Sequence, residues 1–224
     1  MAKTKGRIHQ SAQPKPSRRA GPVPNLPIKP RPAANPDHST IVAAVGVRLK
    51  KLRSNAGLTL EALSKNSGVS RAMLSNVERG EKSPTLTVFV RIATGLGVSL
   101  SKLMGAESDV AETAVVRADK RLTFQDPETG FERHILSPNH IDNGIELLLH
   151  RIPPGQSSGL LPVYNVPTEK LLVVHEGRLT VYAGESRYDL STGDSFYFQV
   201  REPYRFVNIG KTWCSYYLVV AQRR

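Results

Sequence analysis

The chain has 224 residues, of which 39% are hydrophobic, a length and composition that suit two modest globular domains and a tail. Its formal net charge is +12, and its single cysteine, Cys214, excludes an intramolecular disulfide and a cysteine-based zinc site. No long apolar run accompanies the positive charge, which argues against a membrane surface as the partner. We expect Cys214 to be a small buried hydrophobic residue of the last strand.

Residues 1–38 are expected to form a disordered basic tail. They contain eight of the sixteen prolines and eight Lys or Arg residues against one acid, with few large apolar side chains to offset the entropy of ordering the chain. The pair Arg18–Arg19 is not followed by an apolar stretch, so it does not indicate a secretion signal. A cytoplasmic location is therefore expected.

Charge is segregated along the chain. Residues 39–105 hold ten Lys or Arg against three acids, whereas residues 106–224 hold thirteen against fifteen. A DNA duplex is a polyanion, and basic side chains that replace its counterions gain affinity irrespective of sequence. The basic front half therefore predicts double-stranded DNA as the partner.

Residues 57–80 read GLTLEALSKNSGVSRAMLSNVERG and predict two short helices joined by a sharp turn. Thr59 is a good N-cap for the first helix, in which Leu60 and Leu63 share one face. That helix ends before Gly68, which supplies the backbone freedom that the turn needs.

The second helix of this pair has the features of a DNA recognition helix. Leu74 and Val77 face inward, so its exposed side near the N-terminus is free to meet base edges in a major groove. The predicted base contacts on that side are Arg71, Ala72, Ser75 and Asn76. The predicted phosphate contacts are Thr59, Ser70, Arg79 and Lys82.

Residues 41–104 resemble the five-helix DNA-binding domain of the phage-repressor-like (XRE, Cro/CI) family. The resemblance rests on the run G-V-S-x-x-x-L-S-x-V-E-R-G-x-K-x-P, with apolar stripes for further helices on both sides. It implies an all-α domain over residues 39–105 and a structural ion pair between Arg53 and Glu78. The alternative is an ordinary helical bundle whose apolar stripes are only core.

After a polar linker at residues 106–115, the helical period gives way to short strand patterns separated by turns. Strands this short and regular predict an all-β domain over residues 116–224, closed as a barrel or sandwich. The predicted strands are 145–152, 171–174, 179–182, 187–190, 195–198, 204–207 and 213–220.

This half resembles the cupins, with a core at residues 145–221, which implies a double-stranded β-helix or jelly-roll barrel. The segments that carry the resemblance are Pro153-Pro154-Gly155, Thr168-Glu169-Lys170, Val174-His175-Glu176-Gly177, the run 193–198 and the run 203–208. Cupins that bind a metal place histidines and a carboxylate at four positions that here hold Tyr164, Val166, Lys170 and Tyr204. These are not plausible ligands for a divalent ion, so no metal and no other cofactor is expected.

Other histidines do not replace the missing ligands. The histidines of this half are His134, His140, His150 and His175. None has the spacing to another histidine or carboxylate that would aim both at one ion. His175 also has the opposite parity to the apolar positions of its strand, so it is expected on the other sheet face.

The replaced ligand positions predict an effector pocket instead. We expect its lining to include Tyr164, Lys170, Tyr204 and Phe206, all pointing inward. Lys170 would then be the counter-charge for a small anionic metabolite. The alternative is a barrel that is filled by its own side chains and serves only to dimerise.

The order of parts resembles the helix-turn-helix plus cupin transcriptional regulators of bacteria. This resemblance implies that the front domain reads an operator and that the cupin senses a metabolite, pairs subunits, or both. A homodimer on a palindromic operator is expected, because one recognition helix spans few base pairs. Two alternatives remain: a DNA-binding autorepressor or interaction module with an inert cupin, and, disfavoured by the missing ligands, a metal-dependent cupin enzyme fused to a DNA-binding domain. We therefore expect a protein that is not an enzyme.

Overall fold

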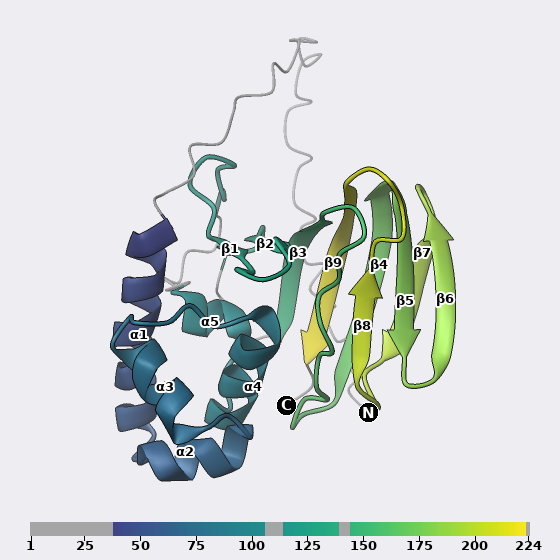
Figure 1. Cartoon of the computed structure of the whole chain (residues 1–224). Coiled ribbons are helices and arrows are strands. Elements are labelled where there is room, and N and C mark those ends of the chain that lie inside the picture. Colours follow the sequence, from purple (N-terminus) through teal and green to yellow (C-terminus); the bar gives the residue numbers. More distant parts are fainter. Residues whose placement is uncertain (1–37, 106–113, 139–143, 223–224) are drawn as a thin grey trace, which may run out of the picture. The chain divides into compact units, whose positions relative to one another are not determined.

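The computed structural model describes residues 38–105, 114–138 and 144–222. The predicted tail, apart from His38, and most of the predicted linker lie outside the described residues. The described chain contains a group of helices followed by two antiparallel sheets (Figure 1), which confirms the predicted fold class. None of the described helices is long and apolar enough to cross a membrane.

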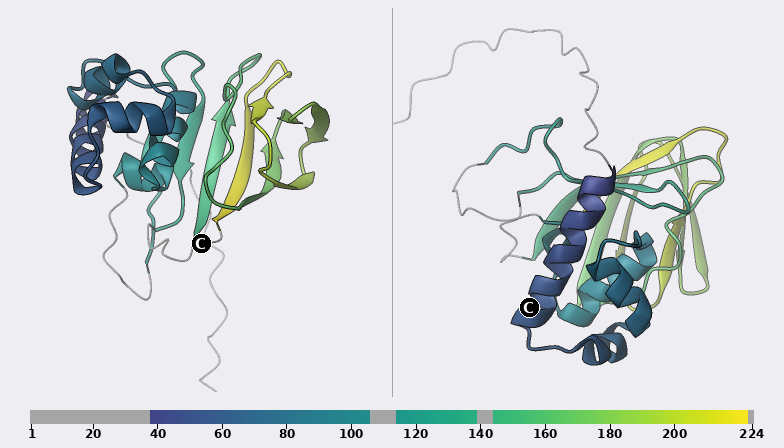
Figure 2. Two further views of the ribbon diagram at one scale, coloured as in Figure 1. Left: turned by 90° about the horizontal axis from the view of Figure 1, so that it is seen from below. Right: turned by 60° about the vertical axis from the view of Figure 1, so that its left-hand side comes forward.

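The front part forms the five predicted helices. Their bounds are α1 (His38–Asn55), α2 (Leu60–Ser67), α3 (Arg71–Glu78), α4 (Leu86–Leu96) and α5 (Leu100–Met104). Figure 2 shows the long α1 lying alongside the shorter helices. The predicted turn between α2 and α3 is formed by Gly68, whose backbone is left-handed with φ 65°.

Side-chain caps fix where these helices begin. Thr59 Oγ1 accepts a 3.0 Å hydrogen bond from the amide of Ala62, and Ser70 Oγ accepts a 3.2 Å bond from the amide of Met73. Each hydroxyl satisfies one of the free amides that a helix N-terminus exposes. The start of the recognition helix is therefore set by local sequence.

The helices bury one apolar core and approach closely where small residues allow it. Its fully buried members include Leu49, Leu63, Leu74, Phe89 and Ile92. Gly46 lets α1 lie against the end of α3, because a β-carbon at this position would overlap the carbonyl oxygen of Val77. The recognition helix is thus held against α1 by backbone contact as well as by its apolar face.

The described residues of the β half form nine strands in two sheets. Their bounds are β1 (Thr123–Gln125), β2 (Glu132–Ile135), β3 (Ile145–Ile152), β4 (Thr168–Glu176), β5 (Arg178–Ala183), β6 (Ser186–Ser191), β7 (Ser195–Gln199), β8 (Tyr204–Val207) and β9 (Cys214–Gln222). The larger sheet has the order β1-β2-β3-β9-β4-β7, and the smaller has the order β6-β5-β8. Seven of the nine strands match predicted ones, and the β1–β2 hairpin was not predicted.

Side chains alternate between the two faces of the larger sheet along most of its length, with a register shift between Val174 and Glu176 on β4. Inward positions include Leu148 on β3, Leu172 on β4 and Leu218 on β9, all buried. The register aligns these residues across neighbouring strands, with Leu218 facing both Leu148 and Leu172. The parity of each strand therefore decides which residues enter the interior of the β half.

Hydrogen bonds and a ring contact also link helix α4 to residues of the β half. The amide of Leu86 donates a 2.6 Å hydrogen bond to Asp126 Oδ2, and the Phe89 ring stacks on Phe124 with centroids 5.4 Å apart. Near the other end of α4, Asn165 Nδ2 donates to the carbonyl oxygen of Thr94 at 3.1 Å. Asp126 is almost fully buried, so its bond to α4 is shielded from solvent.

Candidate functional site

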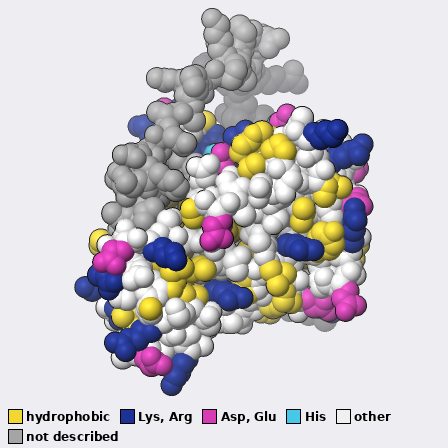
Figure 3. Space-filling view, viewed as in Figure 1, with side chains coloured by type: hydrophobic (Ala, Val, Ile, Leu, Met, Phe, Trp, Pro, Cys, Tyr) yellow, Lys and Arg dark blue, Asp and Glu magenta, His cyan; other side chains and the backbone are white. Residues whose placement is uncertain are grey.

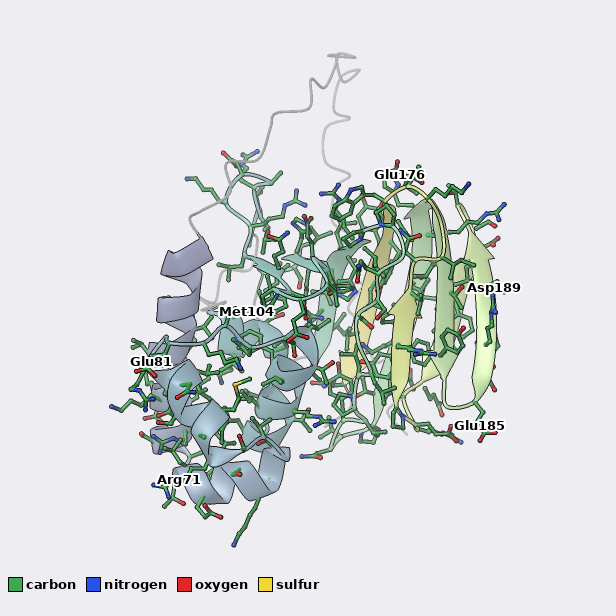
Figure 4. All side chains as sticks on the ribbon, in the orientation of Figure 1. Arg71, Glu81, Met104, Glu176, Glu185 and Asp189 are labelled. Carbon is green, nitrogen blue, oxygen red and sulfur yellow. The ribbon has the colours of Figure 1, made fainter. Side chains whose placement is uncertain are left out.

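The N-terminal end of α3 presents the predicted base-contact residues on the protein surface. Arg71 and Ala72 are exposed, and Figure 4 shows Arg71 projecting away from the helices. Ser75 and Asn76, one turn further along, are partly exposed. Lys and Arg side chains stand out over this helical part in the space-filling view (Figure 3). The four residues therefore share the accessible side of one helix, as a major-groove reader requires.

Arg79 organises the far end of this surface. Its Nη2 donates a 2.8 Å hydrogen bond to Asn76 Oδ1, and its Nη1 donates to Ser75 Oγ. The same guanidinium contacts Glu81 through bonds of 2.6 and 2.7 Å, and this hydrogen bond holds the pKa of Glu81 below its usual range. Two predicted base contacts and one predicted phosphate contact thus form a single network in the free protein.

The remaining predicted phosphate contacts lie at helix ends. Thr59 and Ser70 are exposed and use their oxygens as acceptors in the caps, so their O–H groups remain able to donate to a phosphate. Lys82, in the segment after α3, is exposed. The helix N-termini that these hydroxyls cap also favour anions through their partial positive charge.

Arg53 and Glu78 form the ion pair that the family resemblance implies. Arg53 Nε lies 2.6 Å from Glu78 Oε1 and Nη2 lies 3.0 Å from Oε2, while Nη1 donates to the carbonyl oxygen of Leu58 at 2.8 Å. The two side chains are only 14% and 7% exposed, and the hydrogen bond to Glu78 raises the pKa of Arg53. This bidentate pair connects α1 to the end of the recognition helix.

Inside the β half, the structure brings Tyr164, Lys170 and Tyr204 together. The two phenol oxygens are 3.3 Å apart, and Lys170 Nζ lies 3.5 Å from the Tyr164 oxygen. The ammonium group also faces the rings of Tyr204 and Tyr164, at 4.8 and 5.4 Å from their centroids. Phe206, the fourth predicted pocket residue, is buried and packs edge-on against Tyr204.

The burial of Lys170 perturbs the titration of this cluster. Lys170 is 2% exposed, and burial lowers the pKa of its ammonium group. Burial raises the pKa of the Tyr204 phenol well above its usual value, and nearby Tyr164 raises it further. Burial by itself would raise the pKa of the Tyr164 phenol. The nearby Lys170 and Arg133 outweigh that effect, so the pKa of Tyr164 is lowered. The cluster therefore places an amino group, whose charged form burial disfavours, between two phenols.

A second polar group, which sequence reasoning missed, adjoins the first. Arg133 Nη2 donates a 2.8 Å hydrogen bond to Glu146 Oε2, and both side chains are buried. His150 is buried with Nδ1 3.0 Å from the Tyr216 hydroxyl, and burial followed by the charge of Arg133 lowers its pKa well below the usual value. The expectation that no histidine of this half shares a face with a carboxylate at such a spacing was wrong, because Glu146 and His150 lie four residues apart on the inward face of β3 with Leu148.

The donor set does not suit a metal ion. Among the described residues, no group of three or more His, Cys, Asp or Glu side chains is placed to hold one. The four positions that would carry ligands in a metal-binding cupin hold a buried ammonium group, two phenols and Val166, none of which is a good neutral-pH ligand for a divalent ion. His175 is exposed on the outer face, with its ring 5.4 Å from that of Tyr217.

Cys214 is fully buried at the start of β9. Burial, followed by the nearby charge of Glu176, raises the pKa of its thiol to about 12. A thiol with such a pKa carries almost no thiolate at neutral pH, and the thiolate is the reactive form. Cys214 is therefore a packing residue.

Comparisons with known proteins agree with this two-part organisation. Residues 49–103 match the helix-turn-helix family and residues 148–220 match the cupin domain family. The chain is 49% identical over 53 residues to the HTH-type transcriptional regulator SutR of Escherichia coli, which is 24% of this chain and 30% of that protein. It is 40% identical over 60 residues, 27% of this chain, to an uncharacterized HTH-type transcriptional regulator of Sinorhizobium fredii, and covers 78% of that protein.

A solved structure supports the fold along most of the chain. A transcriptional regulator of the helix-turn-helix family from Vibrio cholerae superimposes with a TM-score of 0.70 at 24% identity, over 83% of this chain and 99% of that one. The chain spans less than a third of the length of SutR, so that relative bears on the helical part alone. Together, the helical match, the cupin match and the α3 surface show that this chain belongs to the helix-turn-helix family of DNA-binding transcriptional regulators and carries a cupin domain.

Proposed function

We propose that this regulator binds a palindromic operator as a homodimer and that a small anion bound inside the cupin domain changes its affinity for that operator. Arg71, Ala72, Ser75 and Asn76 would contact bases, and Thr59, Ser70, Arg79 and Lys82 would contact phosphates. The proposal also holds that the cupin domain uses no metal and catalyses no reaction, because its ligand positions hold Tyr164, Val166, Lys170 and Tyr204.

Lys170 is the observation that carries the sensor part of this proposal. Its ammonium group has three hydrogens to donate, yet among the described residues it forms one hydrogen bond, the 3.5 Å contact with Tyr164. No carboxylate in the described part of the chain forms an ion pair with it. A buried cation without a counter-ion is costly, and an anionic ligand would supply the missing charge.

The charges around Lys170 narrow the ligand class. Arg133 forms an ion pair with Glu146, whereas Lys170 forms none with a described residue, so a ligand with one negative charge would complement the Lys170 ammonium group. Arg133 Nε and Glu146 Oε1 are also buried without a hydrogen-bond partner among the described residues. A monocarboxylate with an additional polar group would pair with Lys170 and reach these two atoms.

The contacts with α4 give a route from this cluster to the DNA-reading helices. Tyr164 is followed directly by Asn165, which bonds to the carbonyl oxygen of Thr94. Arg133 is paired across the sheet with Phe124, whose ring stacks on Phe89. Asn165 is therefore next to a cluster residue in the sequence, and Phe124 is next to Arg133 across the sheet. Each of these two residues that contact α4 lies beside a residue of the buried groups. Helix α4 packs in turn against α2, the first helix of the helix-turn-helix.

The test uses the full chain and a panel of monocarboxylates, dicarboxylates and phosphate esters. A monocarboxylate should raise the melting temperature of the wild type, because a ligand that binds only the folded state stabilises it by mass action. The same compound should shift operator affinity measured by fluorescence anisotropy. Lys170→Ala and Tyr204→Phe should abolish both responses, while the control Lys211→Ala, at an exposed position, should retain them. A response that Lys170→Ala leaves unchanged would refute the assignment.

A second candidate function is an autorepressor with an inert cupin domain. The observation that favours it is the filling of the interior by large side chains, since Tyr204, Phe206 and Tyr216 are fully buried and pack on one another. In that case no compound of the panel would alter either the melting temperature or operator affinity. Lys170→Met would then bind the operator as the wild type does.

A further inference from the structure

The outer face of the larger sheet carries a continuous apolar surface, which we call the outer patch. It is formed by side chains on the side of the sheet opposite to the buried cluster. Its six exposed members are Ile145, Leu147, Leu171, Val173, Tyr197 and Tyr217. Soluble sheets usually place polar side chains on a face that meets water, so this composition calls for a partner.

The strand register shows that these side chains adjoin one another. Leu171 on β4 faces Tyr197 on β7 and Val219 on β9, and Val219 in turn faces Leu147 on β3. Val173 on β4 faces Tyr217 on β9. Side chains directly opposite each other across strands lie about 5 Å apart. The outer patch therefore extends without a break across the four neighbouring strands β3, β9, β4 and β7.

The size of the outer patch matches what a homodimer requires. Its six members are between 38% and 55% exposed, and at about 200 Å² for a fully exposed large side chain they present on the order of 500 Å². Two such patches would together bury on the order of 1,000 Å² of apolar surface. This is close to the apolar share, roughly 65%, of a ~1,600 Å² interface.

The chain itself offers no other segment suited to cover this surface. Residues 1–37 are rich in Pro, Lys and Arg and contain few large apolar side chains. The segments 106–113 and 139–143 each contain a single large aliphatic residue, Val110 and Ile141. The six side chains are uncharged, whereas DNA is bound mainly through Lys and Arg at its phosphates. The six members of the outer patch carry no charge, and an uncharged apolar surface complements a second copy of itself.

We propose that the outer patch is the homodimer interface, with two cupin domains packed sheet against sheet about a two-fold axis. This inference rests on the homodimer of the proposed function and names the surface that forms it. A two-fold axis through the outer patch relates the two helical domains of the dimer by the same operation. The assembly then has the symmetry of a palindromic operator.

The test compares charge introduced in the outer patch with the same charge introduced elsewhere on the β half. Leu171 and Leu160 are the same residue type with similar exposure, 47% and 56%, and only Leu171 lies in the outer patch. Sedimentation velocity of the full chain at micromolar concentration should show a dimer for the wild type and for Leu160→Arg. Leu171→Arg should be monomeric, with the dimer dissociation constant raised at least 100-fold.

A second matched pair of variants allows the test to be made even if one variant of the first pair fails to fold. Ile145, in the outer patch, and Ile209, outside it, are 55% and 53% exposed. Ile145→Arg should weaken the dimer and Ile209→Arg should not, with circular dichroism melts confirming that each variant folds. If both outer-patch variants still form dimers, the outer patch is not the interface, although the proposed homodimer itself still stands. A monomeric wild type would overturn both.

Discussion

Asp126, from the hairpin at the start of the β half, accepts a 2.6 Å hydrogen bond from the amide of Leu86 at the first turn of α4. Its other oxygen accepts bonds from the amides of Glu128 and Thr129, at 2.9 and 3.0 Å, so the carboxylate is fixed from both sides. One side chain therefore caps a helix of the DNA-binding domain and holds a turn of the cupin domain.

Replacement of Asp126 by Ala should destabilise the protein by about 1–2 kcal/mol, because the α4 amide loses its buried acceptor. Asp126→Asn keeps a hydrogen-bond acceptor and should therefore lose less stability than Asp126→Ala. The free energy of unfolding in urea measures the change, with Glu185→Ala, at an exposed position in the turn between β5 and β6, as the control that should show no measurable effect. Equal stability of Asp126→Ala and the wild type would mean that this bond does not join the two parts in solution.

Glu78→Ala should destabilise the helical domain by roughly 2–4 kcal/mol, since it leaves Arg53 partly desolvated and without its bidentate partner. Differential scanning calorimetry of the full chain measures the change in melting temperature. Glu81→Ala removes an exposed partner of Arg79 and should leave the melting temperature unchanged. An unchanged melting temperature for Glu78→Ala would reject a structural role for the Arg53–Glu78 pair.

Arg71→Ala should cost roughly 1–3 kcal/mol of binding on the best operator and little on random DNA, because a base contact is sequence-specific. Deletion of residues 1–38 should instead weaken binding to both DNAs alike and flatten the dependence on salt, because the removed charges meet phosphates. Anisotropy titrations at several salt concentrations separate the two effects. If the deletion removed the preference for the operator, the tail would be reading sequence.

Lys170→Met should stabilise the ligand-free protein at neutral pH, and the gain should shrink as the pH rises. Burial lowers the folded-state pKa of Lys170, so the unfolded chain binds more protons between that pKa and the ordinary value near 10.4. Wild-type stability therefore increases with pH across this interval, whereas the Met variant lacks the effect. Urea unfolding between pH 7 and 9.5 measures the difference, and Lys211→Met, at an exposed position, serves as the control.

The purified protein should contain less than one transition metal per chain, and a chelator should change neither its melting temperature nor its operator affinity. The reason is the donor set at Tyr164, Val166, Lys170 and Tyr204, which offers a chelator no bound ion to remove. Elemental analysis and paired melts with and without chelator provide the measurement. One tightly bound metal per chain would contradict the assignment and favour the enzyme alternative.

The sequence predicted the strands whose patterns are long or clearly alternating. The bounds predicted for 145–152 and 204–207 are those of β3 and β8. It did not predict β1, which has three residues, or β2, because so few residues do not establish a period of two. The contacts that this hairpin makes with α4 depend on tertiary packing, and no local pattern in the sequence indicates them.

The sequence predicted only part of the buried polar groups inside the β half. Tyr164, Lys170 and Tyr204 were identified because they occupy positions that a known motif gives to ligands, and the structure places them in contact. Arg133 and Glu146 were missed, because charged residues are usually exposed and their pairing spans two strands, one of which, β2, was not predicted. Their roles, like those of the surface residues on α3, remain predictions until the variants are measured.

The network around Arg79 has a consequence for how this protein releases ions on DNA. Glu81 occupies two donors of the guanidinium group, as a phosphate would, while Ser75 and Asn76 hold the same group in place. On binding, Arg79 would exchange the Glu81 carboxylate for a phosphate. The phosphate would release its condensed cation, but the freed carboxylate beside the duplex would attract a cation in its place. Its contribution would then appear in the orientation of α3 on the duplex, and hardly in the slope of affinity against salt concentration.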